Sequence, residues 1–422
     1  MKWYNNNYHQ WINNNCYEDN NIIKLTLTNS DLLELSKSID NLINLQKLKC
    51  YDNKLITFPH SIGNLIYLQE IYCFDNVINN FPESIGNLIN LQILYCFNNK
   101  IITLPLSLCN LINLQILDCS HNKLIVIPDI FDNLINLKIL NCSFNNIKKL
   151  PKSINKLHNL LFLNCYNNNL TKLPKLDKLI NLQTLNCSFN KLIKLPKSIK
   201  KLIKLIELNC NNNILTHIVC NINIQKLNCY HNKLIKLPKY IGKMINLNKL
   251  NCSDNRIKKI PRSIYKLINL QKLMCSNNKI SYLSKSIDKL INLTYLLFNN
   301  NLLKYIPMSI IKLNYLQCVN FDNNFLLKYI PINLERFINN IKKYKVIDVH
   351  NNSIQTSLFE SINNLLSENI MINYVSLLIK DDIFDNITKS ILFNFIEDKT
   401  VNKHLLITFE ELLMFIYKKI EN

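Results

Sequence analysis

Cysteine is the residue whose abundance in this sequence most suggests chemistry, because thiols bind zinc, form disulfides and act as nucleophiles. The chain of 422 residues contains 15 cysteines. No two of them form a C-x-x-C pair. Eleven share one register and recur, in most cases, every 23 residues: Cys50, Cys73, Cys96, Cys119, Cys142, Cys165, Cys187, Cys210, Cys229, Cys252 and Cys275. Their spacing is therefore that of a structural repeat rather than of a zinc or redox motif.

One cysteine per repeat would form a straight row across neighbouring strands. Parallel strands lie about 4.8 Å apart, whereas the Cβ atoms of a disulfide are about 3.8 Å apart on average. Tetrahedral zinc needs four converging ligands, which a straight row does not supply. Cysteine also serves as a small buried hydrophobic residue. We therefore predict that the row belongs to the core, that it holds no metal, and that the chain works in a reducing compartment.

The other residue types that could support catalysis do not gather into a motif. The chain has only three glycines, and neither glycine-rich phosphate loop occurs. It also has no H-E-x-x-H zinc motif. The histidines are scattered at His9, His60, His121, His158, His217, His231, His350 and His404. We predict that the protein has no catalytic residues and no cofactor, and that it is not an enzyme.

The cysteine register defines 15 repeat units over residues 22–352. The unit reads L-x-x-L-x-C-x-x-N-x-L-x-x-L-P-x-S-I-x-x-L-I-N. Its asparagine, three residues after the cysteine position, is present in every unit except the first, which has Ser30. We call these residues the asparagine ladder: Asn53, Asn76, Asn99, Asn122, Asn145, Asn168, Asn190, Asn213, Asn232, Asn255, Asn278, Asn301, Asn324 and Asn352. We predict that each amide bonds to the buried backbone of the adjacent unit, because such groups must be paired.

The two halves of the unit predict different elements. The L-x-C stretch alternates apolar and polar residues, which is typical of a strand. The S-I-x-x-L stretch predicts a short helical or 3-10 return, with serine as its N-cap. The unit between Cys210 and Cys229 is four residues short and lacks this second stretch. Because the loss falls on the return, we expect the strand register to continue through it.

The unit resembles the leucine-rich repeat family, whose core pattern is L-x-x-L-x-L-x-x-N/C-x-L. Its L-P-x-S-I-x-x-L half resembles the intracellular Ras-suppressor and plant Ras-group repeats. The composition, rich in Asn, Ile, Lys and Leu, also resembles the repeat proteins of mimivirus-like giant DNA viruses. The resemblance implies an α/β leucine-rich repeat solenoid, shaped as a horseshoe or arc. A parallel sheet would line its concave face, with short helical or 3-10 segments on the convex face and a helical C-terminal cap.

These observations predict three parts of the chain. Residues 1–21 form a polar N-terminal cap, residues 22–352 the repeat array, and residues 353–422 a helical cap or small adaptor region. The N-terminus lacks the apolar stretch of a signal peptide. No apolar run approaches the ~18 residues that span a membrane. We therefore expect an intracellular protein, in the cytoplasm of the cell or of a host cell.

The outward positions beside the cysteines offer a candidate contact surface, because the resemblance implies binding on the concave face. In the early units they carry Tyr51, Tyr72, Phe74, Tyr95 and Phe97. We predict that this first aromatic patch faces solvent and binds a protein partner. Further along, the residue before the cysteine becomes asparagine, and Phe144, Tyr166, Phe189 and Tyr230 interrupt this second row. That row is either part of the contact surface or a device that stabilises the sheet.

The charge is concentrated in the middle of the chain. Residues 141–290 hold 28 Lys and Arg against 4 Asp and Glu, whereas the rest of the chain holds 22 against 25. The residues that recur at repeat spacing include Lys149, Lys152, Lys194, Lys197, Lys236, Lys239, Lys259 and Arg262. Such rows would attract an anionic partner. The leading interpretation is a non-enzymatic scaffold that binds a protein partner on its concave face and modulates host signalling. The alternative is a basic surface for nucleic acid or an anionic membrane.

Overall fold

The computed structural model describes residues 22–327, 330 and 332–342. The described strands are three residues long and end where the cysteine position begins. They are β1 (Lys24–Thr26), β2 (Lys47–Lys49), β3 (Glu70–Tyr72), β4 (Ile93–Tyr95), β5 (Ile116–Asp118), β6 (Ile139–Asn141), β7 (Phe162–Asn164), β8 (Thr184–Asn186), β9 (Glu207–Asn209), β10 (Lys226–Asn228), β11 (Lys249–Asn251), β12 (Lys272–Met274), β13 (Tyr295–Leu297) and β14 (Cys318–Asn320).

All these strands form one parallel sheet in chain order. Each strand pairs with the next at the same repeat position, so that Leu48 lies opposite Ile71 and Leu94 opposite Leu117. The backbone ladder continues past the strand ends, since the Cys50 N–H donates to the carbonyl of Tyr72 at 2.8 Å. The register runs unbroken through the short unit, where Leu208 lies opposite Leu227. The structure thus confirms the predicted solenoid.

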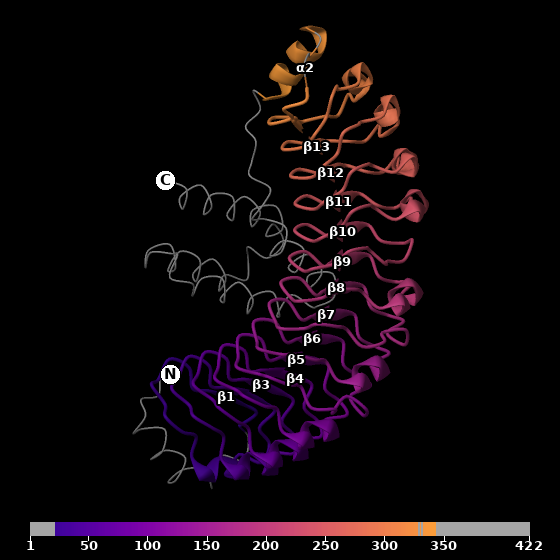
Figure 1. Cartoon of the computed structure of the whole chain (residues 1–422). Helices are drawn as coiled ribbons and strands as arrows, with labels where there is room; N and C mark the ends of the chain where they lie inside the picture. The colour runs from indigo at the N-terminus through magenta and orange to yellow at the C-terminus, as the bar shows by residue number, and fades with distance from the viewer. Residues whose placement is uncertain (1–21, 328–329, 331, 343–422) are drawn as a thin grey trace. The chain divides into compact units, whose positions relative to one another are not determined.

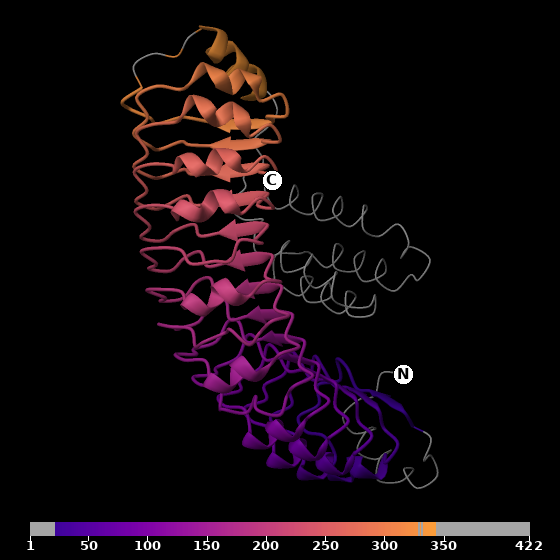
Figure 2. The same cartoon turned by 90° about the vertical axis from the view of Figure 1, so that its right-hand side faces the viewer.

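The described 3-10 helices lie on the opposite side of the array from the strands (Figures 1 and 2). They are η1 (Lys37–Asn41), η2 (His60–Asn64), η3 (Glu83–Asn87), η4 (Leu106–Asn110), η5 (Lys152–Lys156), η6 (Lys197–Lys201), η7 (Lys239–Lys243), η8 (Arg262–Lys266), η9 (Lys285–Lys289) and η10 (Met308–Lys312). No such helix separates β5 from β6, β7 from β8, or β9 from β10.

The predicted serine N-cap is wrong for the units that carry proline. There the cap position is the proline itself, and it makes no side-chain cap bond. The serine stands one residue inside the helix, and Ser263 Oγ donates instead to the carbonyl of Lys239 in the preceding unit at 3.0 Å. Serine caps the helix only where it replaces the proline, as Ser284 does by accepting from the Ser286 N–H at 3.2 Å.

Two polar side chains fill the gap in the short unit. The buried Asn221 donates from Nδ2 to the carbonyl of Leu205 at 3.2 Å. The hydroxyl of Tyr240, from the next unit, accepts from the Cys220 N–H at 3.3 Å. These bonds pair backbone groups that the missing return leaves open, which explains how the array tolerates the deletion.

The core runs through the inside of the coil. It consists of the repeat leucines and isoleucines with the cysteine row, and Phe298 and Phe321 take the cysteine's place in the last described units. After β14 the chain forms the helix α2 (Ile332–Lys342), which contacts β14 and η10. Its Leu334 and Ile338 are buried. This helix lies within the range predicted to be repeats, because the chain leaves the repeat pattern after Phe321.

Some predictions fall outside the described residues. They are the cap at residues 1–21, the helical region at 353–422, and the fifteenth unit, whose cysteine position is Val349. Fourteen of the 15 predicted units are therefore seen as strands of the sheet.

Candidate partner-binding surface

The asparagine ladder joins each unit to the preceding one through both atoms of the amide. Asn145 is representative: its Oδ1 accepts from the Leu124 N–H at 2.9 Å, and its Nδ2 lies 3.0 Å from the carbonyl oxygen of Cys119. The same Nδ2 lies within 3.2 Å of the carbonyls of Cys142 and Ser143 in its own unit. These groups are buried, so the predicted pairing with the adjacent backbone is confirmed.

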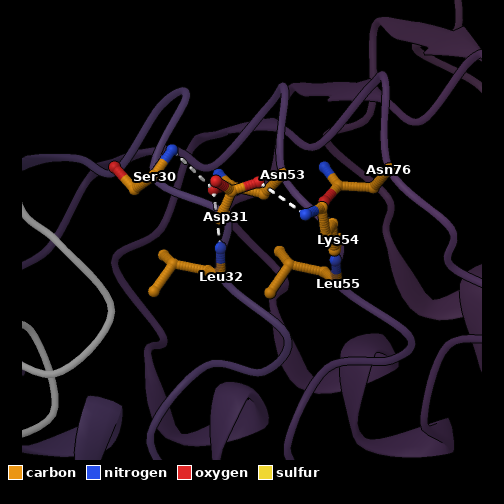
Figure 3. Close-up of polar contacts among 7 residues, drawn as sticks. All are labelled: Ser30, Asp31, Leu32, Asn53, Lys54, Leu55 and Asn76. Carbon is orange, nitrogen blue, oxygen red and sulfur yellow. Dashed lines mark hydrogen bonds and ion pairs between the residues drawn. The ribbon is translucent and has the colours of Figure 1, made fainter.

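Figure 3 shows how the ladder begins. Asn53 Oδ1 accepts from the backbone N–H groups of Ser30 and Leu32 at 3.0 and 3.1 Å. Asn76 repeats the arrangement one unit later by accepting from Leu55 at 2.9 Å. Ser30 stands in the ladder position of the first unit, and its side-chain hydroxyl donates within that unit, to the carbonyl of Thr28 at 3.0 Å. The departure at Ser30 thus falls where no described unit precedes it.

The residue before each ladder asparagine has a left-handed backbone. Its φ is close to 50° in every described unit from the second onward. Short polar residues adopt this conformation most readily, since their side chains bond locally. Asparagine and aspartate fill most of these positions: Asp52, Asp75, Asn98, Asn167, Asn212, Asp254, Asn277, Asn300 and Asn323. The exceptions are His121, Phe144, Phe189 and His231.

The cysteine row is core, as predicted. All 14 cysteines in the described residues are free, and each is buried except Cys109, which is half-buried. Burial raises the pKa of the Cys187 thiol to about 12, so the thiol stays protonated. Most of the row also donates weakly across the sheet, as Cys119 Sγ does to the carbonyl of Asn141 at 3.4 Å. At Cys252 and Cys275 the two sulfurs approach to 3.3 Å.

We expect thiol modification to separate Cys109 from the row. In the native protein, iodoacetamide should modify Cys109 about a hundredfold faster than any row cysteine, because the row is reached only by local unfolding. Mass spectrometry of timed samples measures these rates. In the variant Cys109→Ser, the peptides that carry the row cysteines should keep their slow rates. Rapid modification of Cys119 or Cys142 would contradict burial of the row.

The first aromatic patch is assembled as predicted, but its exposure was predicted wrongly. Phe74 stacks on Tyr51 and on Phe97 with ring centroids 4.4 Å apart in both cases. The ring centroids of Tyr72 and Tyr95 lie 5.4 Å apart, and the Tyr72 hydroxyl donates to the Glu70 carboxylate at 2.7 Å. Only Tyr51 is half-buried, whereas the other four rings are buried. Neighbouring strands bring these rings into contact, so each ring shields the faces of the next from water.

A different set of aromatic residues lies just beyond the ends of the strands; three of its members are exposed and the fourth, Tyr166, is half-buried. His121 stacks on Phe144 at 3.9 Å, and Tyr166 lies 5.0 Å from both Phe144 and Phe189. Phe144 and Phe189 are 38% and 39% exposed. We call His121, Phe144, Tyr166 and Phe189 the aromatic cluster. The sequence carries a signal for it: once the units are aligned, phenylalanine stands out in a position otherwise filled by Asn, Asp or His.

The second row of asparagines on the strands has a structural use. Asn141 Oδ1 accepts from the Ser143 N–H at 3.2 Å, and Asn186 Oδ1 accepts from the Ser188 N–H at 3.1 Å. The row is buried, and its amides hold the turn that follows each strand. Of the two interpretations left open, these bonds favour the device that stabilises the sheet.

The predicted basic positions are exposed without exception. Four of them are the first residues of the 3-10 helices η5 to η8: Lys152, Lys197, Lys239 and Arg262. The other four precede the proline of their units: Lys149, Lys194, Lys236 and Lys259. In the described part of the chain no group of three or more metal-ligating side chains comes together. None of its helices is both long and apolar enough to cross a membrane.

Comparison with known proteins agrees with this geometry. The Leucine Rich Repeat family model matches residues 113–134, 136–157 and 181–202. A leucine-rich repeat protein of Leptospira interrogans is 34% identical, over 77% of this chain and 83% of that one, with a TM-score of 0.70. None of the curated protein sequences matches the chain.

Two further structures share the fold. The plant peptide hormone receptor RGFR1, solved in complex with RGF2, is 29% identical over 72% of this chain and 48% of that one, with a TM-score of 0.57. The functional domain of InlJ from Listeria monocytogenes, which includes a cysteine ladder, is 24% identical over 71% of this chain and 68% of that one, again at 0.57. With its fourteen strands in register, its asparagine ladder and the Leptospira relative, the chain belongs to the leucine-rich repeat family.

Proposed function

We propose that this chain is a non-enzymatic scaffold that binds a protein partner through the aromatic cluster. The single observation that carries the proposal is that two phenylalanines, Phe144 and Phe189, are held exposed in left-handed backbone. The left-handed conformation costs an ordinary residue about 1–2 kcal/mol. Asparagine, which fills this position in neighbouring units, tolerates it better. Phenylalanine therefore lowers the stability of the array while placing its ring in solvent.

Exposed aromatic rings gain most when a partner buries them. Aromatic residues dominate the energetics of protein interfaces because each buries a large area with few rotatable bonds. The stacking of His121 on Phe144, at 3.9 Å, orders one of these rings before any partner arrives. An ordered ring loses less conformational entropy on binding. Binding of a peptide hormone by the similar plant receptor supports a protein or peptide as the ligand class.

The setting of this interaction is also a proposal. The free cysteines support a reducing compartment, so we place the partner inside the cell. The sequence resemblance to giant-virus repeat proteins makes a host signalling protein the partner class that we propose.

The test replaces both rings with the residue that fits the backbone. We expect Phe144→Asn/Phe189→Asn to fold with equal or higher stability and to lose the partners that the intact chain retains from a cell lysate, as identified by quantitative mass spectrometry. His231→Asn is the matched control, because His231 has the same left-handed backbone and exposure outside the cluster. It should retain the partners.

Alanine variants of the first aromatic patch would give a less clear result. Tyr72 and Tyr95 are buried, so truncating them would destabilise the sheet and weaken binding indirectly. If the Phe144→Asn/Phe189→Asn variant kept every partner while Tyr51→Asn lost them, the contact surface would lie in the first units and the proposal would be wrong.

A further inference from the structure

A row of exposed isoleucines runs along the loops that lead into the strands. Its members occupy one repeat position and are between 47 and 63% exposed: Ile43, Ile66, Ile89, Ile112, Ile135, Ile180, Ile203, Ile222, Ile245, Ile268 and Ile291. We call them the isoleucine row. The leucines on either side, such as Leu202 and Leu205 around Ile203, are fully buried. The isoleucine therefore faces water, although the leucines of the same loop lie in the core.

Side chains from the following unit hold this row in place. Asn90 Nδ2 donates to the carbonyl of Ile66 at 2.8 Å, and Asn292 Nδ2 donates to the carbonyl of Ile268 at 2.9 Å. The same bond to a row isoleucine recurs from Asn113, Asn136, Asn159, Asn223 and Asn269, so that seven of the eleven members are held in this way. Asn223 makes it within the short unit, so the row continues across the deletion. The isoleucines are thus displayed on a fixed backbone.

Lysine accompanies the row only in the later units. Two residues before the isoleucine, the early units carry Asn41, Asn64, Asn87, Asn110 and Asn133. The later units, apart from the short one, which has Cys220, carry exposed lysines in that position: Lys178, Lys201, Lys243, Lys266 and Lys289. These lysines lie in the segment whose net charge is strongly positive. We call the later isoleucines from Ile180 to Ile291, together with these lysines, the isoleucine–lysine ridge.

The ridge places apolar and positively charged side chains in the same units. Contiguous exposed apolar patches mark binding surfaces, and the exposed isoleucines recur at one position in unit after unit instead of being scattered singly. Aliphatic side chains beside lysines suit the interface of an anionic bilayer, where the apolar groups enter the acyl boundary and the ammonium groups meet the headgroups. Most of these units repeat the same pair of an isoleucine and a lysine. Such a repetition suits a partner whose surface is the same along its whole length, as a bilayer is. Nucleic acid would use the lysines but would leave the isoleucines in water.

We propose that the isoleucine–lysine ridge binds the surface of an anionic phospholipid bilayer. The aromatic cluster consists of other residues, so the two proposals stand or fall separately.

The test uses the full chain and flotation with vesicles of phosphatidylserine and phosphatidylcholine. The intact protein should float with these vesicles and not with phosphatidylcholine alone. Ile203→Asn/Ile245→Asn/Ile268→Asn should weaken binding by about tenfold or more, because it removes the inserted groups. The matched control Ile66→Asn/Ile89→Asn/Ile112→Asn changes the same repeat position in units without lysine and should bind as the intact protein does.

A second pair of variants separates the ridge from general charge. Lys243→Gln/Lys266→Gln should weaken flotation by about tenfold, since each lysine near an anionic membrane contributes a severalfold effect. Lys236→Gln/Lys259→Gln removes the same charge away from the ridge and should have a much smaller effect. Circular dichroism melting checks that all variants are folded.

Three outcomes would overturn the proposal. The first is that the intact protein does not float with anionic vesicles. The second is that the later and early isoleucine variants bind equally well. The third is that a duplex oligonucleotide binds to the intact chain, loses affinity in the lysine variants and not in the isoleucine variants, and prevents flotation. That result would assign the basic surface to nucleic acid.

Discussion

Replacing one member of the asparagine ladder, Asn145→Ala, should lower the free energy of unfolding by about 3 kcal/mol, because it leaves buried backbone groups unpaired. The Leu124 N–H would lose Oδ1, which accepts from it at 2.9 Å. The carbonyl oxygens of Cys142 and Ser143 would lose a donor. Water cannot replace these bonds without opening the stack between two units. Urea denaturation followed by circular dichroism measures the change.

The neighbouring residue provides a control with the same chemical change. Asn146 is exposed, so Asn146→Ala should change the stability by less than about 0.5 kcal/mol, as surface substitutions usually do. A solenoid is held together by contacts between nearest neighbours. The Asn145→Ala variant should therefore also unfold less cooperatively, with a lower dependence on urea. If the two variants were equally stable, the amide would not be joining the units.

The repeat made the asparagine ladder and the cysteine row predictable. A residue such as Cys142 recurs in a fixed register, so its environment can be inferred once for every unit: inside the coil, between two strands. The ladder amides follow from the same argument, since a buried backbone must be paired. The core could be predicted from the repeat because each unit packs there only against units of nearly the same sequence.

The predictions that the structure corrected concern residues whose surroundings are determined by the neighbouring unit. Ser263 caps no helix, because a proline occupies the cap position and the serine reaches the adjacent unit instead. The rings of Tyr72 and Phe74 are buried by rings of neighbouring strands. None of these properties belongs to a single unit read alone.

The isoleucine row shows a related limit of the sequence pattern. The L-I-N end of each unit places two apolar residues side by side, and hydrophobicity alone would place both in the core. In the structure, however, the isoleucine lies in a tight turn between two buried leucines; around Ile203 this turn is closed by the Leu205 N–H, which donates to the carbonyl of Leu202 at 3.0 Å. The leucine takes the inner position and the isoleucine must face out. Which of the two is buried depends on the position that each occupies in the turn, and the cysteine register alone does not determine those positions.

The glycines mark positions where adjacent returns lie too close together to leave room for a Cβ atom. All three glycines of the chain, Gly63, Gly86 and Gly242, occupy the same repeat position in a 3-10 helix. A Cβ atom at Gly86 would lie 2.5 Å from both the carbonyl oxygen and the Cβ of Ser107 in the next unit. Real Cβ contacts are essentially never below 3.0 Å. The buried hydroxyls of Ser84 and Ser107 also make no hydrogen bond within the described structure.

We expect Gly86→Ala to destabilise the array by about 2–3 kcal/mol, near the upper end for overpacked sites, because η3 and η4 must separate. Cys109→Ala is the matched control: Cys109 is the equivalent residue of η4, and no 3-10 helix follows it in the next unit. The Cys109→Ala variant should lose much less stability than Gly86→Ala. Thermal melting of both variants gives the difference, and equal melting temperatures would mean that the returns can move apart freely.

A double-mutant cycle then identifies the atoms responsible. Ser107→Gly removes one of the two close contacts, the Cβ, and leaves the carbonyl oxygen in place. The double variant Gly86→Ala/Ser107→Gly should therefore recover part of the lost stability, with a coupling energy of about 1 kcal/mol. Full recovery would assign the strain to the serine side chain alone. If no stability were recovered, the strain would come from the contact with the backbone carbonyl. The glycines would then be the residues that set the spacing between adjacent returns.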